Sequence, residues 1–479
     1  MRKKNFYITT TLPYVNDKPH IGFALEIIQA DAIARYKKLT GYDVFFNFGT
    51  DEHGQKIYQK ALEEKKGPQD YVDEYAKKFD GLKKALNLSY NNFIRTTDPH
   101  HIKAAQGLWK VCEKNGFIKK SIYQAKYCVG CELEKQDSEL INGRCPIHPN
   151  LEIQLINEEN YFFKFSQFQE KLLKLYKSDP DFVIPKHRLT EISNFIKDNP
   201  QDFSVSRLKE KMPWGVAVPG DDKQVMYVWF DALTNYISAL GWPEDKEKFR
   251  QFWGTKENPN AIQVAGKDNL RQQSAMWQAM LMAADLPPSK QIIIHGFITS
   301  GGQKMSKSLG NVIDPFYYVE KYGTDALRYY LLAKISPFED SDFTKESFEQ
   351  VYQADLANGL GNLIARVAGL AKNLKLNAKS FKLGFSKEVA NNIEKYNQDK
   401  ALEFVWDEIK KTDVLINEKQ VWNLKGKEKE KVLRDLVKRI RQIAYDLKPF
   451  LPETSEKIEK QFKGPNIKSQ KPLFPRLEQ

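Results

Sequence analysis

The sequence of 479 residues contains few cysteines and no long hydrophobic run. Four cysteines in a chain of this length exclude a disulfide-stabilised secreted scaffold and indicate a reducing compartment, so we expect a cytoplasmic protein. No apolar stretch approaches the roughly 20 residues of a membrane-spanning helix, and we expect no membrane partner. The first residues, MRKKNFYITT, lack the apolar core of a secretory signal, and we expect none there.

The composition is that of a globular protein with an uneven distribution of charge. Hydrophobic residues make up 41% and aromatic residues 12% of the chain, whose length predicts about two to four domains. From residue 351 to 479 there are 26 lysines and arginines against 17 aspartates and glutamates, whereas the first 350 residues hold 48 against 45. A basic C-terminal module that binds a polyanion would explain this excess. Lysine-rich, solvated helix faces are the alternative.

Near the N-terminus the residue pattern predicts a parallel βαβ unit. FYITT (residues 6–10) is typical of a strand, and residues 23–38 place apolar side chains at a helical spacing. YDVFFNF (residues 42–48) follows as a second, fully apolar strand. Ligands bind at the carboxyl ends of the strands in such sheets, where PHIG and GTDEHG would both lie.

A second α/β pattern returns more than a hundred residues later. MYVWF predicts a strand, ALTNYISAL a helix, AIQVAG a strand, the residues up to Met282 a helix, and QIIIHG a final strand. The residues between the two patterns, about 115–223, are expected to form an inserted domain. After Tyr352 the pattern is that of long helices, which predicts a helical bundle.

Three of the four cysteines belong to a metal-ligand pattern. Two residues separate Cys128 from Cys131, and after thirteen further residues Cys145 and His148 repeat that spacing. Two such pairs supply four ligands in a tetrahedron, which suits zinc. Four protein ligands leave no open position, so we expect one structural zinc ion per chain. Unrelated buried cysteines are the alternative, and Cys112, outside the pattern, is expected in the core.

Residues 299–311, TSGGQKMSKSLGN, place two cations between glycines. Lys304 and Lys307 follow Gly301 and Gly302 and precede Gly310, so the backbone around both ammonium groups can bend. The pattern predicts a loop that closes over an anion. A solvated surface loop is the alternative reading of so short a motif.

A second short motif, Pro19-His20-Ile21-Gly22, lies between the first strand and its helix. Free N–H groups at a helix N-terminus favour phosphate, and Gly22 allows a close approach. The imidazole of His20 can donate a hydrogen bond to developing negative charge. Paired with the lysine loop, the motif predicts that a triphosphate is held between the two halves of the sheet.

These motifs together resemble those of the class I aminoacyl-tRNA synthetases, and more narrowly the methionyl-tRNA synthetases. The two class signatures are a His-Ile-Gly-His-type motif and Lys-Met-Ser-Lys-Ser. The likeness covers nearly the whole chain through TTTLPYVNDKPHIG, FNFGTDEHGQKI, the cysteine pairs, WGVAVPGDD, MYVWFDALTNYI, GKDN, HGFITSGGQKMSKSLGN, KYGTDALRYYLL and NGLGNLIAR.

The resemblance implies an α/β fold with a split Rossmann-like parallel-sheet catalytic domain, an inserted zinc-bearing connective domain and a C-terminal all-α anticodon-binding bundle. The expected domains are the first catalytic half (1–114), the connective insert (115–223, with the zinc knuckle at about 125–152), the second catalytic half (224–298), the Lys-Met-Ser-Lys-Ser loop with a stem-contact region (299–350), and the anticodon-binding domain (351–479).

It also implies roles for individual residues. His20, Asp51, Lys304 and Lys307 would be catalytic, with Asp51 accepting the α-ammonium group of the substrate. ATP would be bound by His20, Gly22, Lys304, Ser306 and Lys307. The methionine site would consist of Leu12, Tyr14, Asp51, Trp229, Ala232, Leu233, Tyr236 and Gln273, with Arg207 and Asp268 supporting it. Asn362, Arg366 and Trp422 would meet the tRNA anticodon through base-edge hydrogen bonds and stacking.

The sequence departs from the family pattern at a few positions. Phe23 stands where the family usually repeats histidine, which removes one donor to the nucleotide. Asn269 and Gln273 replace residues that are usually isoleucine and histidine, and Asn269 makes the pocket less apolar. Val421 precedes Trp422 where the family tends to have proline.

The activity implied is that of a methionine–tRNA ligase, which activates methionine with ATP and Mg²⁺ and transfers it to tRNA(Met), including the initiator. We expect a monomer. A synthetase for another apolar amino acid is an alternative, although an insert of about a hundred residues is too small for a second, hydrolytic site. A catalytically silent tRNA-binding relative would have little reason to keep His20, Asp51 and both lysines. A generic zinc module would leave the α/β halves unexplained.

Overall fold

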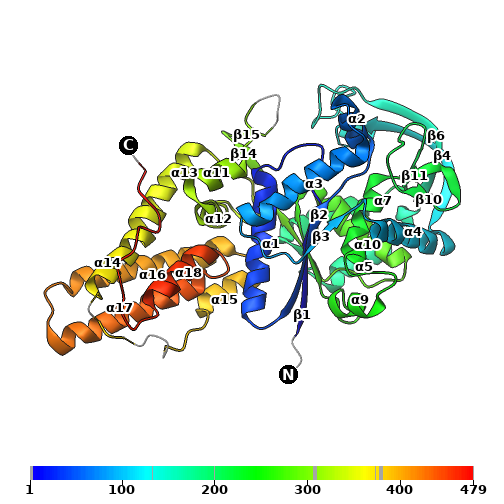
Figure 1. Ribbon diagram of the computed structural model, residues 1–479. Coiled ribbons are helices and arrows are strands. Elements are labelled where there is room, and N and C mark those ends of the chain that lie inside the picture. Colours follow the sequence, from blue (N-terminus) through cyan, green and yellow to red (C-terminus); the bar gives the residue numbers. More distant parts are fainter. Residues whose placement is uncertain are drawn as a thin grey trace.

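The structure is a computed structural model that describes residues 4–131, 133–198, 200–305, 310–372, 374–376 and 381–477. Figure 1 shows an α/β body joined on one side by a helical bundle and extended on the other side by a β-rich insert. Within the described ranges, none of the helices combines the length and the apolar character needed to cross a bilayer.

The centre of the body is a six-stranded sheet in which every neighbouring pair is parallel. Its order is β3-β2-β1-β12-β13-β7, so strands of both halves of the sequence meet where β1 pairs with β12. The strands are β1 (Asn5–Thr10), β2 (Asp43–Thr50), β3 (Asn92–Arg95), β7 (Val183–Ile184), β12 (Ala261–Gly266) and β13 (Gln291–His295). The predicted split parallel sheet is confirmed, and β7 adds to it from within the range 115–223.

Helices cover both faces of the sheet because its strands are apolar on both faces. On β1, Phe6 and Ile8 join one hydrophobic core and Tyr7 joins the other. The first face carries α1 (Ile21–Leu39) and α3 (Pro68–Ala85), with α2 (Gln55–Glu63) contacting α3. The second face carries α4 (Pro99–Lys114), α5 (Gln169–Ser178), α6 (Lys186–Lys197), α9 (Lys246–Phe252) and α10 (Trp277–Ala283).

The insert is built on a long antiparallel hairpin. Strands β4 (Ile118–Cys128) and β6 (Gln154–Phe163) pair over most of their length, flanked by β5 (Leu133–Lys135) and β8 (Phe203–Ser204). A second small sheet follows, in the order β10-β11-β9. Its strands are β9 (Ser206–Leu208), β10 (Ala217–Val218) and β11 (Asp221–Met226). Figure 1 shows both sheets on the side of the body away from the bundle. The backbone N–H of Gly54, shortly after β2, donates to the carbonyl of Trp214, between β9 and β10, at 3.1 Å.

The prediction of a strand at MYVWF is wrong beyond its first residue. Strand β11 ends at Met226, and Val228, Trp229 and Phe230 form the first turn of α7 (Val228–Leu233), which is followed by α8 (Asn235–Ser238). A short apolar run does not distinguish a buried strand from a buried helix, because both conceal all of its side chains. Here the residues after Met226 begin the helix α7.

A connecting region follows the sheet and leads to the bundle. It contains the strands β14 (Ile298–Ser300), β15 (Gln303–Lys304) and β16 (Ser341–Asp342) and the helices α11 (Pro315–Tyr322), α12 (Thr324–Ala333) and α13 (Lys345–Val351). The bundle comprises a π-helical turn (Tyr352–Gly361), α14 (Asn362–Leu370), α15 (Lys387–Glu394), α16 (Gln398–Glu418), α17 (Gly426–Leu447) and α18 (Pro452–Phe462). The predicted helical bundle is therefore confirmed.

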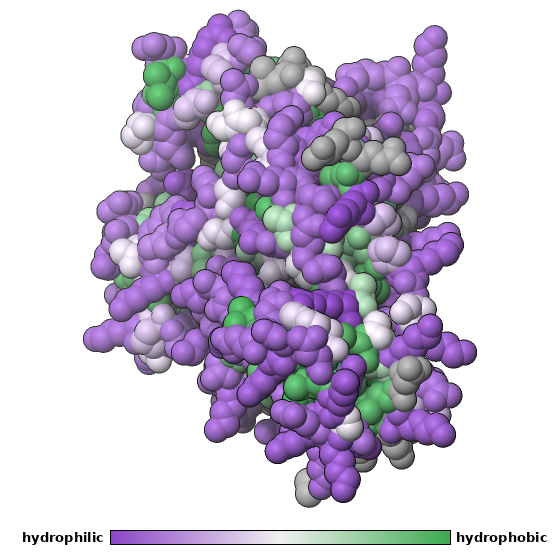
Figure 2. Space-filling view, turned by 90° about the vertical axis from the view of Figure 1, so that its left-hand side faces the viewer, coloured by the Kyte–Doolittle hydropathy of each residue, from purple (hydrophilic) through white to green (hydrophobic). Residues whose placement is uncertain are grey.

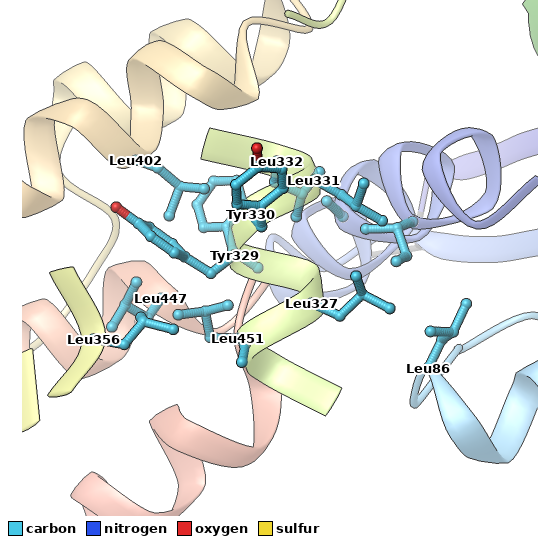
Figure 3. Packing of buried hydrophobic residues seen from close by; sticks show 14 of the residues in the cluster. Leu86, Leu327, Tyr329, Tyr330, Leu331, Leu332, Leu356, Leu402, Leu447 and Leu451 are labelled. Atoms are coloured by element: carbon cyan, nitrogen blue, oxygen red, sulfur yellow. The ribbon is translucent and has the colours of Figure 1, made fainter. Parts of the chain in front are cut away.

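Helix α12 joins the α/β body and the bundle into one core. Figure 3 shows Leu327 of α12 directed towards Leu86, while Tyr329 lies among Leu356, Leu402 and Leu447 of the bundle. A buried ion pair reinforces the junction, because Nη1 of Arg328 lies 2.8 Å from Oδ2 of Asp31 on α1. The same guanidinium donates to the carbonyl oxygens of Pro449 and Phe450.

The outer surface of the bundle is mostly hydrophilic, with hydrophobic residues in small groups (Figure 2). The amphipathic helix α17 illustrates the cause, because it buries Leu436, Ile440 and Leu447, whereas its lysines and arginines are not among its buried residues. The basic excess predicted for this part of the chain is thus carried on solvent-facing helix surfaces.

Candidate active site

His20 is the N-cap of α1, at the carboxyl end of the parallel sheet. Its Nδ1 accepts a hydrogen bond of 3.1 Å from the backbone N–H of Gly22, so the proton of the neutral ring resides on Nε2. Burial lowers the pKa of His20 to about 4, against a smaller opposing effect of Asp17. The ring packs on Phe23 with 4.3 Å between centroids. The site therefore offers a neutral N–H donor beside a helix N-terminus.

The chain that follows the lysine loop contacts the N-terminus of α1. Gly301 and Gly302 both have positive φ and form the turn of the β14–β15 hairpin, which brings Thr299 opposite Lys304. Beyond the loop, the carbonyl of Ile313 accepts a 3.0 Å hydrogen bond from the backbone N–H of Ile21. The predicted residues Ser306 and Lys307 lie outside the described residues.

Asp51 follows β2 and is tied to the segment that follows β1. Its backbone N–H donates to the carbonyl of Pro13 at 3.0 Å, and its carbonyl accepts from Val15 at 3.1 Å, in a parallel bridge between Tyr14 and Asp51. Leu12 lies in the same half-buried segment. Because the carboxyl ends of β1 and β2 adjoin, the predicted residues Leu12, Tyr14 and Asp51 come together at one edge of the sheet.

Gly54 closes this edge and has to be a glycine. Its φ is +108°, and a Cβ atom would lie 2.5 Å from the hydroxyl oxygen of Tyr14 and 3.8 Å from Cβ of Val228. The close approach holds the Asp51 segment against Tyr14 on one side and the start of α7 on the other.

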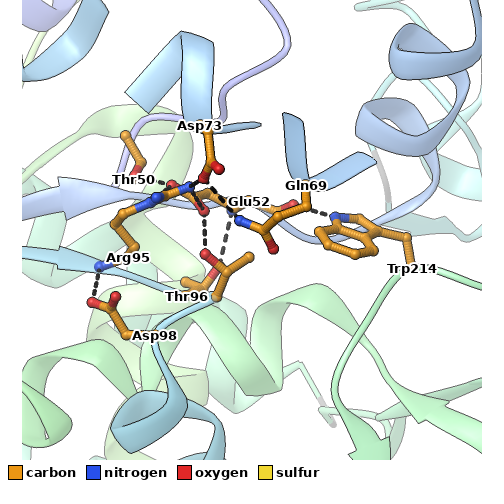
Figure 4. A network of polar contacts seen from close by, with 9 residues as sticks. Thr50, Glu52, Gln69, Asp73, Arg95, Thr96, Asp98 and Trp214 are labelled. Carbon is orange, nitrogen blue, oxygen red and sulfur yellow. Dashed lines mark hydrogen bonds and ion pairs between the residues drawn. The ribbon is translucent and has the colours of Figure 1, made fainter. Parts of the chain in front are cut away.

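A buried charge network that the sequence reasoning missed follows Asp51 directly. Figure 4 shows the carboxylate of Glu52 facing the guanidinium of Arg95, whose Nε and Nη2 donate to it at 2.7 and 2.8 Å. Thr50 donates to the same carboxylate at 2.6 Å, and Trp214 donates its indole N–H to the backbone carbonyl of Glu52 at 2.6 Å. Both contacts fix the backbone that carries Asp51. In the sequence, only the two adjacent acidic residues of TDEHG, Asp51 and Glu52, indicated this network.

A second buried network begins at the next residue. Nδ1 of His53 lies 2.6 Å from one carboxylate oxygen of Asp231, and Nε2 of His101 lies 2.9 Å from the other. Burial raises the pKa of Asp231, but the two imidazoles outweigh burial and lower the pKa to about 2. Asp231 belongs to α7, whereas His53 follows β2 and His101 lies on α4, both before the insert in the sequence. The network therefore joins the two halves of the α/β body behind the residues that are predicted to bind the substrate methionine. Sequence reasoning did not anticipate it.

The predicted apolar pocket residues lie on two short helices. Trp229, Ala232 and Leu233 belong to α7 and Tyr236 belongs to α8, and Ala232, Leu233 and Tyr236 are buried. Gln273 lies on a π-helical turn and donates its amide N–H to the hydroxyl oxygen of Tyr236 at 2.7 Å. Its amide oxygen accepts from Gln263 at 2.9 Å. Both ends of the Gln273 amide are therefore hydrogen-bonded within the protein, and one of them fixes the hydroxyl group of Tyr236.

A further group bridges the two halves near Asp268. Glu26 of α1 accepts from the backbone N–H of Thr11 at 2.7 Å, and its other oxygen lies 3.0 Å from Nε2 of His295 at the end of β13. Burial lowers the pKa of His295, but the hydrogen bond that its ring donates to Glu26 and the negative charge of Glu26 raise the pKa overall. A Cβ on Gly266 would lie 2.7 Å from Oδ1 of Asp268. Glu26 and His295 were not predicted as site residues.

Arg207 lies between two tyrosine rings at the junction of insert and body. Its guanidinium carbon is 5.3 Å from the ring centroid of Tyr127 and 4.4 Å from that of Tyr227. Nη1 donates to Oγ of Ser204 and to the carbonyl of Ser206, both at 2.7 Å. The side chain is therefore held in one position, close to the start of α7.

The four predicted metal ligands converge in the insert. Their ligand atoms all lie within 4.8 Å of one another, with Sγ of Cys131 3.5 Å from Sγ of Cys145 and 3.2 Å from Nδ1 of His148. A tetrahedral ion with bonds of about 2.3 Å separates its sulfur ligands by about 3.8 Å, so the donor set fits zinc in both chemistry and size. A Cβ on Gly130 would lie 2.4 Å from His148, which explains the glycine in the knuckle. The cluster could hold a metal ion.

In the bundle, the predicted anticodon residues lie close together. Asn362 begins α14 and Arg366 follows one helical turn later on the same face. The guanidinium of Arg366 lies 5.6 Å from the ring centroid of Trp422 and donates to Asp413 at 2.8 Å. The side chain of Trp422 is 49% exposed, whereas most of the large aromatic side chains of a folded protein are buried.

Comparison with known proteins identifies the family. The family model described as tRNA synthetases class I (M) matches residues 6–154 and 135–368. A methionine–tRNA ligase of Clostridium acetobutylicum is 40% identical over 96% of this chain and 73% of its own length, and one of Nostoc sp. is 39% identical over 99% of this chain and 93% of its own.

Solved structures agree with these sequence matches. The methionyl-tRNA synthetase of Mycobacterium tuberculosis bound by methionyl-adenylate superposes with a TM-score of 0.90 at 31% identity, covering 98% of this chain and 100% of that one. Its free-state structure gives a TM-score of 0.83 at 29% identity, with 100% and 99% coverage. Since the split sheet, the insert and the converging signatures are all matched over nearly the full length, the chain belongs to the class I tRNA synthetases of the methionine (M) family.

Proposed function

We propose that this chain is a methionine–tRNA ligase, which converts methionine and ATP to methionyl-adenylate and pyrophosphate and then transfers the methionyl group to the 3′ end of tRNA(Met). Its relatives carry this name, and the structural neighbours bind methionyl-adenylate. One observation carries the proposal: His20, Asp51 and the base of the lysine loop meet at the carboxyl end of one parallel sheet, beside the Trp229–Tyr236 segment.

The proposed activation step requires orientation and charge stabilisation, without a covalent enzyme intermediate. A carboxylate oxygen of methionine attacks the α-phosphorus of ATP, and the bond to the pyrophosphate oxygen breaks. The neutral His20 would donate its Nε2–H to the developing negative charge, while the backbone at Gly22 would approach the phosphates. Lys304 and Lys307 would neutralise the triphosphate, together with Ser306. Mg²⁺ would enter as the complex with ATP.

The substrate would be held by its ammonium group and its side chain. Asp51 would accept the α-ammonium group, because its backbone is fixed between Pro13 and Val15. Leu12, Tyr14, Trp229, Ala232, Leu233 and Tyr236 would surround the thioether, whose polarisable sulfur packs well against aromatic rings. Gln273 would add a polar group to the methionine site, held in place by its hydrogen bond to Tyr236, and Arg207 and Asp268 would support the site.

The remaining modules would serve the metal and the tRNA. Cys128, Cys131, Cys145 and His148 would hold one structural zinc ion, since four protein ligands leave no position for substrate. Asn362, Arg366 and Trp422 would read the anticodon of elongator and initiator tRNA, and the basic residues after 351 would meet the phosphate backbone. We also propose the domain boundaries given above and a monomeric state.

The test is ATP–pyrophosphate exchange that depends on the amino acid. Methionine would be compared with leucine, isoleucine, valine, cysteine and homocysteine. Exchange driven chiefly by methionine is the expected result. Exchange driven by another amino acid would contradict the assigned pocket, and no exchange by folded, zinc-loaded protein would favour a silent tRNA-binding relative.

A further inference from the structure

A chain of buried, uncharged side chains leads from the predicted methionine site into the second half of the α/β body. In order, it consists of Tyr236, Gln273, Gln263, Ser289 and Gln278, none of which is more than 2% exposed. An N–H or hydroxyl group left unpaired at such a depth loses its hydrogen bonds to water without replacement. The direction in which each proton points is therefore fixed by the partners on either side.

Backbone groups fix the orientation of the Gln278 amide, at the end of the chain remote from the site. Its oxygen Oε1 accepts a hydrogen bond of 3.1 Å from the backbone N–H of Ser289, and its nitrogen Nε2 donates one of 3.0 Å to the backbone carbonyl of Gln273. Because a backbone N–H can only donate and a carbonyl can only accept, a reversed amide would lose both hydrogen bonds. Nε2 of Gln278 therefore also donates to Oγ of Ser289, at 3.0 Å.

The hydroxyl group of Ser289 transmits this direction towards the site. Since its oxygen already accepts from Gln278, its single proton is donated to Oε1 of Gln263. Nε2 of Gln263 is thereby turned towards Oε1 of Gln273, to which it donates at 2.9 Å. Nε2 of Gln273 in turn donates to the hydroxyl oxygen of Tyr236 at 2.7 Å. Tyr236 is thus the acceptor in the last link, and within the described part of the chain its own hydroxyl proton has no acceptor.

We propose that Ser289 and Gln278 are positioning residues for amino-acid selection, because they direct the hydroxyl proton of Tyr236 to the substrate side chain. The inference rests on the proposed function. A thioether sulfur accepts a hydrogen bond, whereas the methylene group at the same place in norleucine does not. With the amides of Gln263 and Gln273 reversed, Tyr236 would donate its proton to Gln273 and offer the substrate only lone pairs. The direction set at Ser289 therefore favours methionine over an isosteric hydrocarbon side chain.

Two substitutions at the remote end of the chain test this role without touching the substrate. Ser289→Ala removes the hydroxyl group that holds the amide of Gln263 in one orientation, and Gln278→Met removes the donor that is anchored to the backbone. The matched control is Ser274→Ala, because Ser274 is fully buried on the same turn as Gln273 and its Oγ has no hydrogen-bond partner among the described residues. Each protein would be assayed for pyrophosphate exchange with methionine and with norleucine, and the two kcat/KM values compared.

The unmodified protein and Ser274→Ala are expected to prefer methionine to norleucine by the same ratio of kcat/KM. In Ser289→Ala and Gln278→Met this ratio should fall by about fivefold, the usual effect of losing one hydrogen bond.

An equal loss with both amino acids would show a merely structural role and would overturn the inference, as would an unchanged ratio in both variants. Equal use of methionine and norleucine by the unmodified protein would overturn it without any variant. Absence of exchange with every amino acid in the unmodified protein would instead refute the proposed function, so the two failures are distinguishable.

Discussion

The backbone N–H of Ile21 donates a 3.0 Å hydrogen bond to the carbonyl oxygen of Ile313. Ile21 is the first residue of the helix that His20 caps, and Ile313 lies just beyond the Lys-Met-Ser-Lys-Ser loop. The first signature motif is thus joined through its backbone to the segment that directly follows the second, which is far away in the sequence. An anion held between them would have a fixed side at the helix N-terminus and a side that depends on the lysine loop.

Replacing His20 with asparagine should lower kcat/KM for ATP in pyrophosphate exchange by about a hundredfold, the usual effect of losing one donor to developing charge. Because burial lowers the pKa of His20 to about 4, the ring is neutral throughout pH 5 to 8. The ratio of unmodified to variant activity should therefore be constant over this range. A ratio that changes near pH 6.5 would show that His20 titrates with an ordinary pKa.

The same shift has a consequence for stability. The pKa of His20 is lower in the folded protein than the value of about 6.5 in the unfolded chain. The unfolded state therefore binds more protons between about pH 4 and 6.5, and the contribution of His20 is fully present above pH 6.5 and lost as the pH falls to 4. In urea unfolding between pH 4 and 6.5, the free energy of unfolding of the unmodified protein should therefore rise more steeply with pH than that of His20→Asn. Above pH 7 the pH dependence of the two proteins should differ less.

Arg95→Met should destabilise the protein and weaken methionine binding. The substitution leaves the fully buried carboxylate of Glu52 without its cation, at a cost of about 3 kcal/mol in the free energy of unfolding. Since Glu52 adjoins Asp51, KM for methionine should rise more than kcat falls. Asp73→Asn is the matched control, because Asp73 contacts the same guanidinium from an exposed position. An equal effect of both variants on KM would refute a role for the Glu52–Arg95 pair in placing Asp51.

The sequence predicted those features that depend on local pattern. The β1–α1–β2 unit followed from residue periodicity. The prediction that PHIG and GTDEHG lie at the same edge of the sheet followed from the rule that parallel strands end at one edge. The convergence of Cys128, Cys131, Cys145 and His148, which could hold a metal ion, followed from the spacing of these residues. In each case neighbouring residues, or one general rule, carried enough information.

The features that it did not predict depend on distant pairing. Nothing in the sequence near His53 or His101 indicates that both bind the carboxylate of Asp231, since the three residues meet only when the two halves of the sheet assemble. The helical start of α7 was missed for a related reason, because its apolar residues are buried by the surrounding fold in either conformation. The hydrogen bond of Gln273 to Tyr236 likewise requires the folded pocket.

Cys131→Ser should lower the zinc content from one ion per chain to a small fraction of that value. A thiolate contributes more to zinc affinity than a hydroxyl. Sγ of Cys131 lies 3.5 Å from Sγ of Cys145 and 3.2 Å from Nδ1 of His148, close enough for all three atoms to bind one ion. Metal analysis and thermal unfolding would measure the change, with a lower Tm for the insert. Cys112→Ser is the control, because Cys112 is buried in the core away from the cluster. Zinc loss in the control alone would contradict the assignment.

Arg366→Ala should separate tRNA charging from amino-acid activation. Arg366 lies on α14 at the face of the half-exposed Trp422, and Figure 1 shows α14 in the bundle, apart from the central sheet, so the loss of Arg366 should leave pyrophosphate exchange unchanged. Aminoacylation should fall by about tenfold or more in kcat/KM for tRNA, the usual effect of one base contact. Arg434→Ala is the matched control, because Arg434 forms an exposed helix-surface ion pair with Glu430 and lacks an aromatic neighbour of this kind among the described contacts. If both arginines reduced charging equally, the effect would arise from general phosphate attraction, and the anticodon assignment would fail.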